Sequence, residues 1–169
     1  MVVVDTHERL LSLLEAHGAE YRLIDHQPEG RTVIASALRG HSLREAAKCL
    51  VLRVNAGQAT SRYVLAVVPG DRRVDVEAIK ALFGATSVGF ARREVAERLA
   101  GCVSGSVLPF SLHSELELVV DPEVLDVPTL YFNAARLDRS IGLRAEDYAR
   151  IARPRLAPIA LRESPSLAA

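Results

Sequence analysis

The 169-residue sequence predicts a single α+β domain, in which a mixed, twisted β-sheet of about six to seven strands is surrounded by helices. Segments with helical periodicity are interleaved with segments of alternating polarity, and the connections between them include both hairpins and crossovers. The sequence has no internal repeat and no shift in composition that would indicate a second domain. It also lacks a P-loop and a dinucleotide-binding glycine pattern, which argues against a doubly wound nucleotide-binding fold.

Composition restricts the classes of function. Hydrophobic residues make up 49% of the sequence, and 21 basic residues balance 21 acidic ones, so any contact with nucleic acid is expected to be local. No apolar run approaches the roughly 20 residues of a membrane span, and the N-terminal segment becomes acidic too soon for a signal peptide. The two cysteines, Cys49 and Cys102, match neither a disulfide framework nor a zinc motif. We therefore expect a reduced, cytoplasmic protein without a metal or cofactor.

The N-terminal third begins with a capping box. Asp5 and Glu8 have the spacing that starts a helix, and Gly18 ends that helix. Alternating polarity then predicts a first strand, which is followed by a turn, a short helix and a single helical turn. These four elements are expected at residues 21–25, 26–30, 32–38 and 42–45.

A central strand is predicted at residues 46–54, and alternation along it places Lys48 on the same face as Leu50 and Leu52. Only Lys48 and Lys80 among the 21 basic residues are lysines. A charged lysine on an apolar face is costly unless it meets an anion or a cavity. Lys48 either lies at the frayed start of the strand and extends to water, or it contacts an anionic ligand; we favour the ligand.

The remaining residues complete the mixed pattern. Three prolines and no firm periodicity after residue 153 predict a loosely docked tail at 154–169, so the domain itself is expected to cover residues 1–153. Strands are expected at 63–68, 87–90, 115–120, 129–133 and 140–143, and helices at 76–83, 92–99 and 145–152.

The loop at residues 101–110 is the strongest candidate for a binding element. Two glycines and a proline shape it, and the stretch from Gly105 to Leu108 offers several backbone N–H groups in a tight bend closed by Pro109. Such a bend can hold a carbonyl oxygen or a developing oxyanion. The alternative is an ordinary connection whose glycines only make the turn. The Ser106 hydroxyl either contacts a ligand or stabilises the bend.

The other polar candidates are weaker. Cys102 lies in the loop, but no histidine is evidently paired with it, so it is interpreted as a small buried hydrophobe. The histidines at positions 7, 17, 41 and 113 are interpreted as surface residues.

The order of these pieces resembles the YbaK-like family, the prolyl-tRNA synthetase-associated editing domains. The resemblance spans about residues 5 to 153, and its combination of motifs is more specific than any one of them. It rests on His26 at the end of a strand, Lys48, the Gly105-x-x-x-Pro109 loop, Asp121 at the end of a strand, and Asn133 in Tyr131-Phe132-Asn133-Ala134.

The resemblance implies hydrolysis of the ester that joins an amino acid to the terminal adenosine of a tRNA, without a protein nucleophile or a metal. Lys48 and Gly105 would be the catalytic positions: the lysine near the ester or terminal phosphate, and the loop amides on the aminoacyl carbonyl. The substrate-binding positions would be His26, Ser106, Val107, Leu108, Pro109, Asp121 and Asn133. His26 lines the pocket or caps its turn, and Asp121 and Asn133 could equally be structural.

We expect a deacylase that acts in trans on a mischarged tRNA carrying a small amino acid, with tRNA-Pro among the candidate carriers. The acceptor end of the tRNA would be the main partner, and a synthetase is a candidate for delivery. The alternatives are a hydrolase of a different small aminoacyl ester and a non-catalytic binding module. Ser104 stands where many relatives have Pro, and Ala135 where many have Gly, which leaves the amino acid open.

Overall fold

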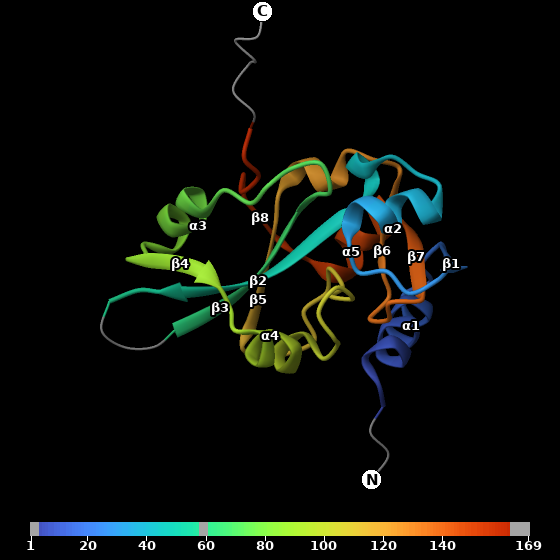
Figure 1. The fold of residues 1–169 in the computed structure, drawn as a ribbon, viewed down its shortest axis with the longest axis horizontal. Coiled ribbons are helices and arrows are strands. Elements are labelled where there is room, and N and C mark those ends of the chain that lie inside the picture. The colour runs from blue at the N-terminus through green and yellow to red at the C-terminus, as the bar shows by residue number, and fades with distance from the viewer. Residues whose placement is uncertain (1–3, 58–60, 163–169) are drawn as a thin grey trace, which may run out of the picture.

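Two β-sheets form the framework of this protein in a computed structural model that describes residues 4–57 and 61–162 (Figure 1). Within these residues, one sheet has five strands in the order β4-β2-β3-β5-β8 and the other has three in the order β1-β7-β6. The elements are α1 (Thr6–Ala16), β1 (Tyr21–Asp25), α2 (Thr32–Arg39), η1 (Leu43–Glu45), β2 (Ala47–Asn55), β3 (Ser61–Pro69), α3 (Val76–Phe83), β4 (Ser87–Phe90), α4 (Arg93–Ala100), β5 (Leu116–Val120), η2 (Pro122–Leu125), β6 (Thr129–Asn133), β7 (Arg139–Arg144), α5 (Ala145–Ala152) and β8 (Arg155–Leu156).

The predicted α+β class is confirmed, and the sheet arrangement refines it. The five-stranded sheet is mixed, because β2 pairs antiparallel with β3 and β4 while β5 pairs parallel with β3 and β8. The described strands are divided between two sheets instead of forming one, and a single parallel bridge between Ala46 and Tyr131 joins the start of β2 to β6. This junction matters for function because it leaves one end of β2 beside the small sheet.

Local sequence signals set the helix boundaries. The Asp5 side chain accepts a hydrogen bond from the Glu8 N–H at 2.8 Å and starts α1, and Asp75 caps α3 in the same way through the Ala78 N–H. The capping box of Ser42 and its helical turn is also present in η1. These capped starts lie within a residue or two of the predicted boundaries, where short-range hydrogen bonds decide the structure.

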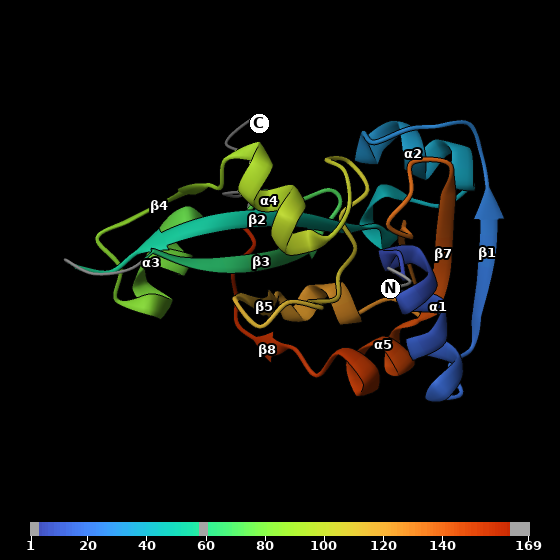
Figure 2. The same ribbon diagram turned by 90° about the horizontal axis from the view of Figure 1, so that it is seen from below.

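Two apolar clusters stabilise the two faces of the large sheet. One contains side chains of α1, α4, α5 and the small sheet packed against β2, β3 and β5, and the other contains α3 and the C-terminal segment. Figure 2 shows the small sheet standing at one end of the molecule with α1 beside it. No helix in the described ranges is long and apolar enough to cross a bilayer.

The C-terminal segment docks more firmly than the sequence predicts. Residues Arg155 and Leu156 form β8 against β5, and Ile159 and Ala160 are buried. The expectation of a loosely docked tail is therefore wrong for residues 155–160. Hydrogen bonds of its backbone, including two to the carboxylate of Asp121, hold the segment in place, and such contacts leave no periodic pattern in the sequence.

Candidate active site

A cavity of about 230 Å³ lies where the small sheet meets the start of β2. Its walls come from four separate parts of the sequence: the start and inner face of α2, the first residues of β2, the loop after α4, and the end of β6. The lining residues are Gly30, Thr32, Ala35, Arg39, Ala47, Lys48, Cys49, Leu50, Gly105, Val107 and Asn133.

One wall is a single face of α2. Thr32, Ala35 and Arg39 are spaced three and four residues apart, so their side chains lie along one side of the helix. The Arg39 guanidinium is partly buried and forms no ion pair with a carboxylate in the described part of the protein. Burial lowers the pKa of Arg39 to about 10, which leaves it charged at neutral pH.

The opposite wall is an uncovered edge of β2. The neighbouring strand β4 pairs only with the second half of β2, and its cover begins where the Ala91 N–H donates to the Val51 carbonyl at 3.0 Å. The first half of β2 therefore faces the cavity along its edge. Lys48 lies on this wall, donates to the Arg72 carbonyl at 3.3 Å, and pairs with no carboxylate that the structure describes.

The third wall is the predicted loop, and Gly105 is its closest approach. Gly105 has a φ of +90°, and a Cβ at this position would lie 2.9 Å from the Gly30 Cα and 3.3 Å from the Leu137 side chain. Only glycine fits that backbone and that contact. The amides of Gly105 and Val107 have no hydrogen-bond partner among the described contacts, so they are free to bind a ligand oxygen.

Asn133 joins the loop to the small sheet. Its Nδ2 donates to the carbonyls of Glu29 at 2.9 Å and Gly105 at 3.0 Å. Its Oδ1 accepts from Arg39 Nη2 and from the Ser140 hydroxyl, each at 2.9 Å. All four contacts of this buried side chain, whose residue is 6% exposed, are made to groups at or behind the cavity wall, so Asn133 fixes the cavity's shape.

His26 lies behind this wall instead of lining the cavity. Its Nε2 is 2.7 Å from the Ser140 hydroxyl, and its Nδ1 donates to the Gln27 carbonyl at 2.8 Å. Ser140 also accepts from Arg39 Nε at 2.8 Å. Among the described contacts, His26 is therefore linked to the cavity through Ser140, which contacts both Arg39 and Asn133. This arrangement fits the turn-capping alternative, with an added link to the site.

The remaining loop residues are structural in their contacts. Ser106 is fully buried, and its hydroxyl donates to the Val103 carbonyl at 2.7 Å, which stabilises the bend. Leu108 is buried in the core, and the carbonyl of Pro109 accepts from the Tyr148 hydroxyl at 2.7 Å. Of the predicted loop contacts, the structure brings Gly105 and Val107 to the cavity wall.

Asp121 lies away from the cavity. Its carboxylate accepts hydrogen bonds from the N–H groups of Glu123, Ile159 and Ala160 at 2.8 to 2.9 Å, and it is completely buried. These contacts correspond to the structural alternative for this residue, because the carboxylate joins β5 to the C-terminal segment.

Neither cysteine is suited to nucleophilic attack. Burial raises the pKa of both the Cys49 and the Cys102 thiols, so they are protonated at neutral pH. In the described residues, no group of three or more His, Cys, Asp and Glu side chains could hold a metal ion.

The sequence interpretation missed two features of the site. Arg39 was hidden among 19 arginines, although its spacing from Thr32 and Ala35 on a short helix was a usable signal. The surface interpretation is also wrong for two of the four histidines: His7 is 6% exposed, with Nδ1 2.7 Å from the Ala134 carbonyl, and His41 is half-buried against Tyr131, with ring centroids 3.9 Å apart. Both contacts join segments far apart in sequence.

The fold is that of the aminoacyl-tRNA editing domains. The model of the family described as "Aminoacyl-tRNA editing domain" matches residues 27–151, and this protein belongs to that family. The resemblance to the YbaK-like editing domains is thereby confirmed.

Known relatives span nearly the whole sequence. The Escherichia coli (strain K12) protein named "Multifunctional Ser/Thr-tRNA deacylase ProXp-y" is 37% identical over 152 residues, which are 89% of this protein and 90% of the relative. Among solved structures, "hypothetical protein APE2540" is 26% identical, with a TM-score of 0.81 over 91% of this protein and 100% of that one. A crystal structure described as "a putative trans-editing enzyme for prolyl tRNA synthetase" shares the fold, with a TM-score of 0.76 at 18% identity over 95% and 100% of the two proteins.

Proposed function

We propose that this protein is an aminoacyl-tRNA deacylase that acts in trans and hydrolyses the ester between a small amino acid and the terminal adenosine of a mischarged tRNA. The observation that carries the proposal is the cavity of about 230 Å³, which brings Lys48 together with the amides of Gly105 and Val107, for which the described residues provide no hydrogen-bond partner. Family membership and the deacylase relative support the reaction class.

The geometry suggests a division of roles for the ester. The Gly105 and Val107 amides bind the acyl carbonyl and stabilise the negative charge that develops on its oxygen when water adds. Lys48 attracts the terminal nucleotide and orients the ester, because its ammonium has donors left after the contact with the Arg72 carbonyl. The bond to the ribose oxygen then breaks, and that oxygen takes a proton from the attacking water. No thiol takes part, because both remain protonated.

Seryl- and threonyl-tRNA are the first substrates to test. The relative at 37% identity is named a Ser/Thr-tRNA deacylase, and the cavity has room for a small side chain. Thr32 also brings a hydroxyl to the wall formed by α2. Gly105 and Val107 bind the substrate through their amides, and Asn133 positions Gly105 and Arg39 at the cavity wall.

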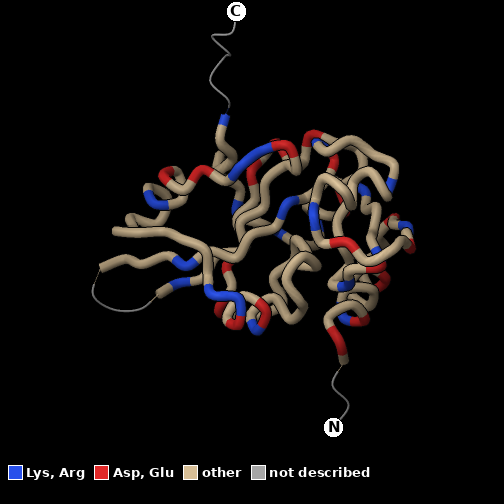
Figure 3. Tube along the Cα trace, viewed as in Figure 1, with Lys and Arg blue, Asp and Glu red and all other residues tan. Residues whose placement is uncertain are grey.

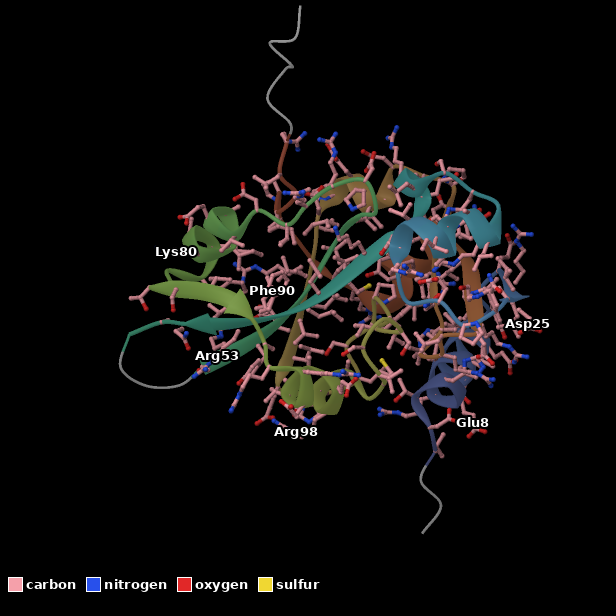
Figure 4. All side chains as sticks on the ribbon, in the orientation of Figure 1. Glu8, Asp25, Arg53, Lys80, Phe90 and Arg98 are labelled. Atoms are coloured by element: carbon pink, nitrogen blue, oxygen red, sulfur yellow. The ribbon has the colours of Figure 1, made fainter. Side chains whose placement is uncertain are left out.

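Contact with tRNA is local, as the neutral net charge requires. Phe90 is 71% exposed at the end of β4, where the open edge of β2 begins, and Figure 4 shows it between α3 and α4. Arg92 follows it, is exposed, and pairs with no carboxylate in the described ranges. Figure 3 shows basic residues gathered where β4 leads into α4. An exposed ring next to a cationic segment suits a base of the single-stranded 3′ end.

The test is deacylation of tRNAs charged with Ala, Ser, Cys, Thr and Pro, including mischarged tRNA-Pro, with and without added synthetase. We expect wild-type protein to clear at least one of these, and Lys48→Ala to reduce kcat/KM by about 100-fold or more. Lys80→Ala is the matched control, because Lys80 is the other lysine and lies on α3. Folded wild-type protein that clears none of them overturns the proposal, and equal activity on free aminoacyl esters moves the assignment to a different hydrolase.

A further inference from the structure

The open edge of β2 presents backbone groups to the cavity, and its register shows which ones. In an antiparallel sheet, the N–H and C=O of one residue point to the same neighbouring strand, and successive residues alternate between the two neighbours. Val51 accepts from Ala91 on the β4 side, and Ala46 accepts from the Gly70 N–H on the β3 side at 2.9 Å. Odd-numbered residues of β2 therefore face the β4 side, and β4 ends before it reaches Cys49.

Cys49 is the residue of β2 whose backbone N–H and C=O meet no described strand on the β4 side. Both of its immediate neighbours and Cys49 itself line the cavity, as expected when the strand meets the cavity edge-on. The thiol is turned to the Ala47 carbonyl at 3.7 Å and lies in the apolar interior. What Cys49 offers to the cavity is thus one backbone N–H and one backbone carbonyl, in the spacing of a strand.

The charges that line the cavity indicate what a neutral backbone N–H and C=O could bind there. The described lining residues include two cations, Arg39 and Lys48, and no carboxylate. The α-amino group of an aminoacyl ester consequently finds no acidic side chain there, and a neutral carbonyl is the acceptor that can take its N–H. The amino and acyl carbonyl groups of one extended amino acid match the C=O and N–H of one strand residue, which is the unit of β-strand addition.

We propose that the aminoacyl group docks on the backbone of Cys49 as a one-residue antiparallel strand. The Cys49 carbonyl accepts from the α-amino group, and the Cys49 N–H donates to the acyl carbonyl. That oxygen gains a third lone pair when water adds, so the oxyanion can accept from the Cys49 N–H and from the loop amides of Gly105 and Val107 together. The proposal deepens the proposed function and depends on it. It explains how a cavity with two positive charges selects an α-amino acid through neutral groups.

The first experiment varies the substrate at the α-position alone. One tRNA is charged with serine, with 2,3-dihydroxypropanoate, and with 3-hydroxypropanoate, and each enzymatic rate is divided by the rate of spontaneous hydrolysis of the same ester. We expect the 3-hydroxypropanoyl ester, which has no donor at the α-position, to lose about 10- to 100-fold in normalised kcat/KM, since one buried hydrogen bond is missing. The dihydroxy ester keeps an O–H donor and should fall between the other two.

The outcomes separate this proposal from the proposed function. Hydrolysis of the seryl and 3-hydroxypropanoyl esters at equal normalised rates overturns the docking on Cys49 but leaves a deacylase. If the protein hydrolyses none of the aminoacyl-tRNAs in the broader panel, it is the proposed function that fails. In that case the second experiment still tests whether the strand edge binds an aminoacyl group.

The second experiment observes the Cys49 amide directly. Labelling with 15N-cysteine gives signals from two residues only, because the sequence has no cysteine other than Cys49 and Cys102. On adding a non-hydrolysable 3′-serylamido adenosine, the Cys49 amide should shift and exchange its proton more slowly; the second signal belongs to Cys102 in the loop after α4. An unchanged Cys49 amide at saturating ligand would overturn the proposal.

Discussion

Asp121 and Asn133 look alike in the sequence, but the structure gives them different partners. Each is the polar residue at the end of an apolar strand, and each is buried, with 0% and 6% exposure. Asp121 directs its carboxylate at backbone N–H groups of η2 and the C-terminal segment. Asn133 directs its amide at Glu29, Gly105 and Arg39, which lie around the cavity.

This comparison shows that burial and full hydrogen bonding do not distinguish a structural residue from a site residue. Both side chains are satisfied, as buried polar groups must be. The distinction lies in the position of their partners. Those of Asp121 hold backbone segments together, whereas Gly105 and Arg39, two partners of Asn133, line the cavity. Asp121 should therefore govern stability, and Asn133 should govern catalysis.

The largest expected effect is on stability, in Asp121→Ala. Three backbone N–H groups would lose a charged acceptor, and two of these hydrogen bonds are buried, so unfolding should become easier by about 3 kcal/mol or more. For a protein of this size, that corresponds to a fall in Tm of about 6–12 °C. Thermal denaturation followed by circular dichroism would measure it.

Glu123→Ala is the matched control. The Glu123 carboxylate is partly exposed and pairs with Arg72 and Arg162, so its removal should change the Tm by little. Below its Tm, Asp121→Ala should retain activity. A variant with unchanged Tm and no activity would reverse the interpretation of Asp121 and place it in the site.

Asn133→Ala should show the opposite pattern. Without the amide, the Gly105 carbonyl and Arg39 lose their common partner, and the loop amides move relative to Lys48. We expect kcat/KM for the best substrate of the panel to fall by about 10- to 100-fold, because small displacements of positioning groups cost rates of this order. Asn55→Ala, at the far end of β2, is the control and should retain activity. Wild-type rates for Asn133→Ala would remove it from the site.

Whether the sequence predicts a structural feature of this protein depends on how far apart in the sequence the interacting residues lie. Caps such as Asp5 and the alternation that exposes Lys48 to the cavity are local, and the sequence predicts them. The bend at Gly105 is also readable, since glycine and proline restrict the backbone there. Two of the three hydrogen-bond partners of Asp121 and three of the four partners of Asn133 lie 28 or more residues away in sequence, for example Ile159 and Gly105, and no local pattern indicates them.

Arg39→Lys tests whether the contacts of the guanidinium with Asn133 and its neighbours matter, or only its positive charge. The guanidinium contacts Asn133, Ser140 and His41 through three different nitrogens, and a lysine ammonium cannot reproduce that fork. We expect kcat/KM to fall by about 10-fold at preserved net charge, with a smaller change in Tm than for Asp121→Ala. Arg44→Lys, an exposed arginine of η1, controls for the loss of any guanidinium. An Arg39→Lys enzyme as active as wild type would show that charge alone suffices.

Phe90→Ala should have a smaller effect, confined to the tRNA. Loss of the ring on which a base stacks is expected to raise KM for charged tRNA by about 5- to 10-fold, the lower part of the usual range for one stacked base, and to leave kcat unchanged. The rate on a minimal aminoacyl-adenosine, which has no further bases, should not change. Phe90→Tyr keeps the ring and should behave as wild type. An equal loss on both substrates would mean that Phe90 supports the cavity and does not contact tRNA.

The smallest expected effect is a pH dependence of stability that comes from His41. Its Nδ1 donates to the Ser42 carbonyl at 2.8 Å and its Nε2 accepts from Arg39 Nη1 at 3.3 Å, which describes a neutral ring. Burial, together with the charges of Arg39 and Arg22, lowers the pKa of His41, against the Ser42 carbonyl and Glu45, which favour the charged form. The stability that this neutral ring contributes is therefore complete above about pH 6.5 and is lost as the pH falls through the lower, folded-state pKa.

Urea denaturation between pH 7.5 and 5 should show a smaller loss of unfolding free energy for His41→Gln than for wild type, while His17→Gln, at the exposed end of α1, should follow wild type. Parallel curves for wild type and His41→Gln would show that the ring does not support Arg39, and would leave Asn133 and Ser140 as its only supports among the contacts described.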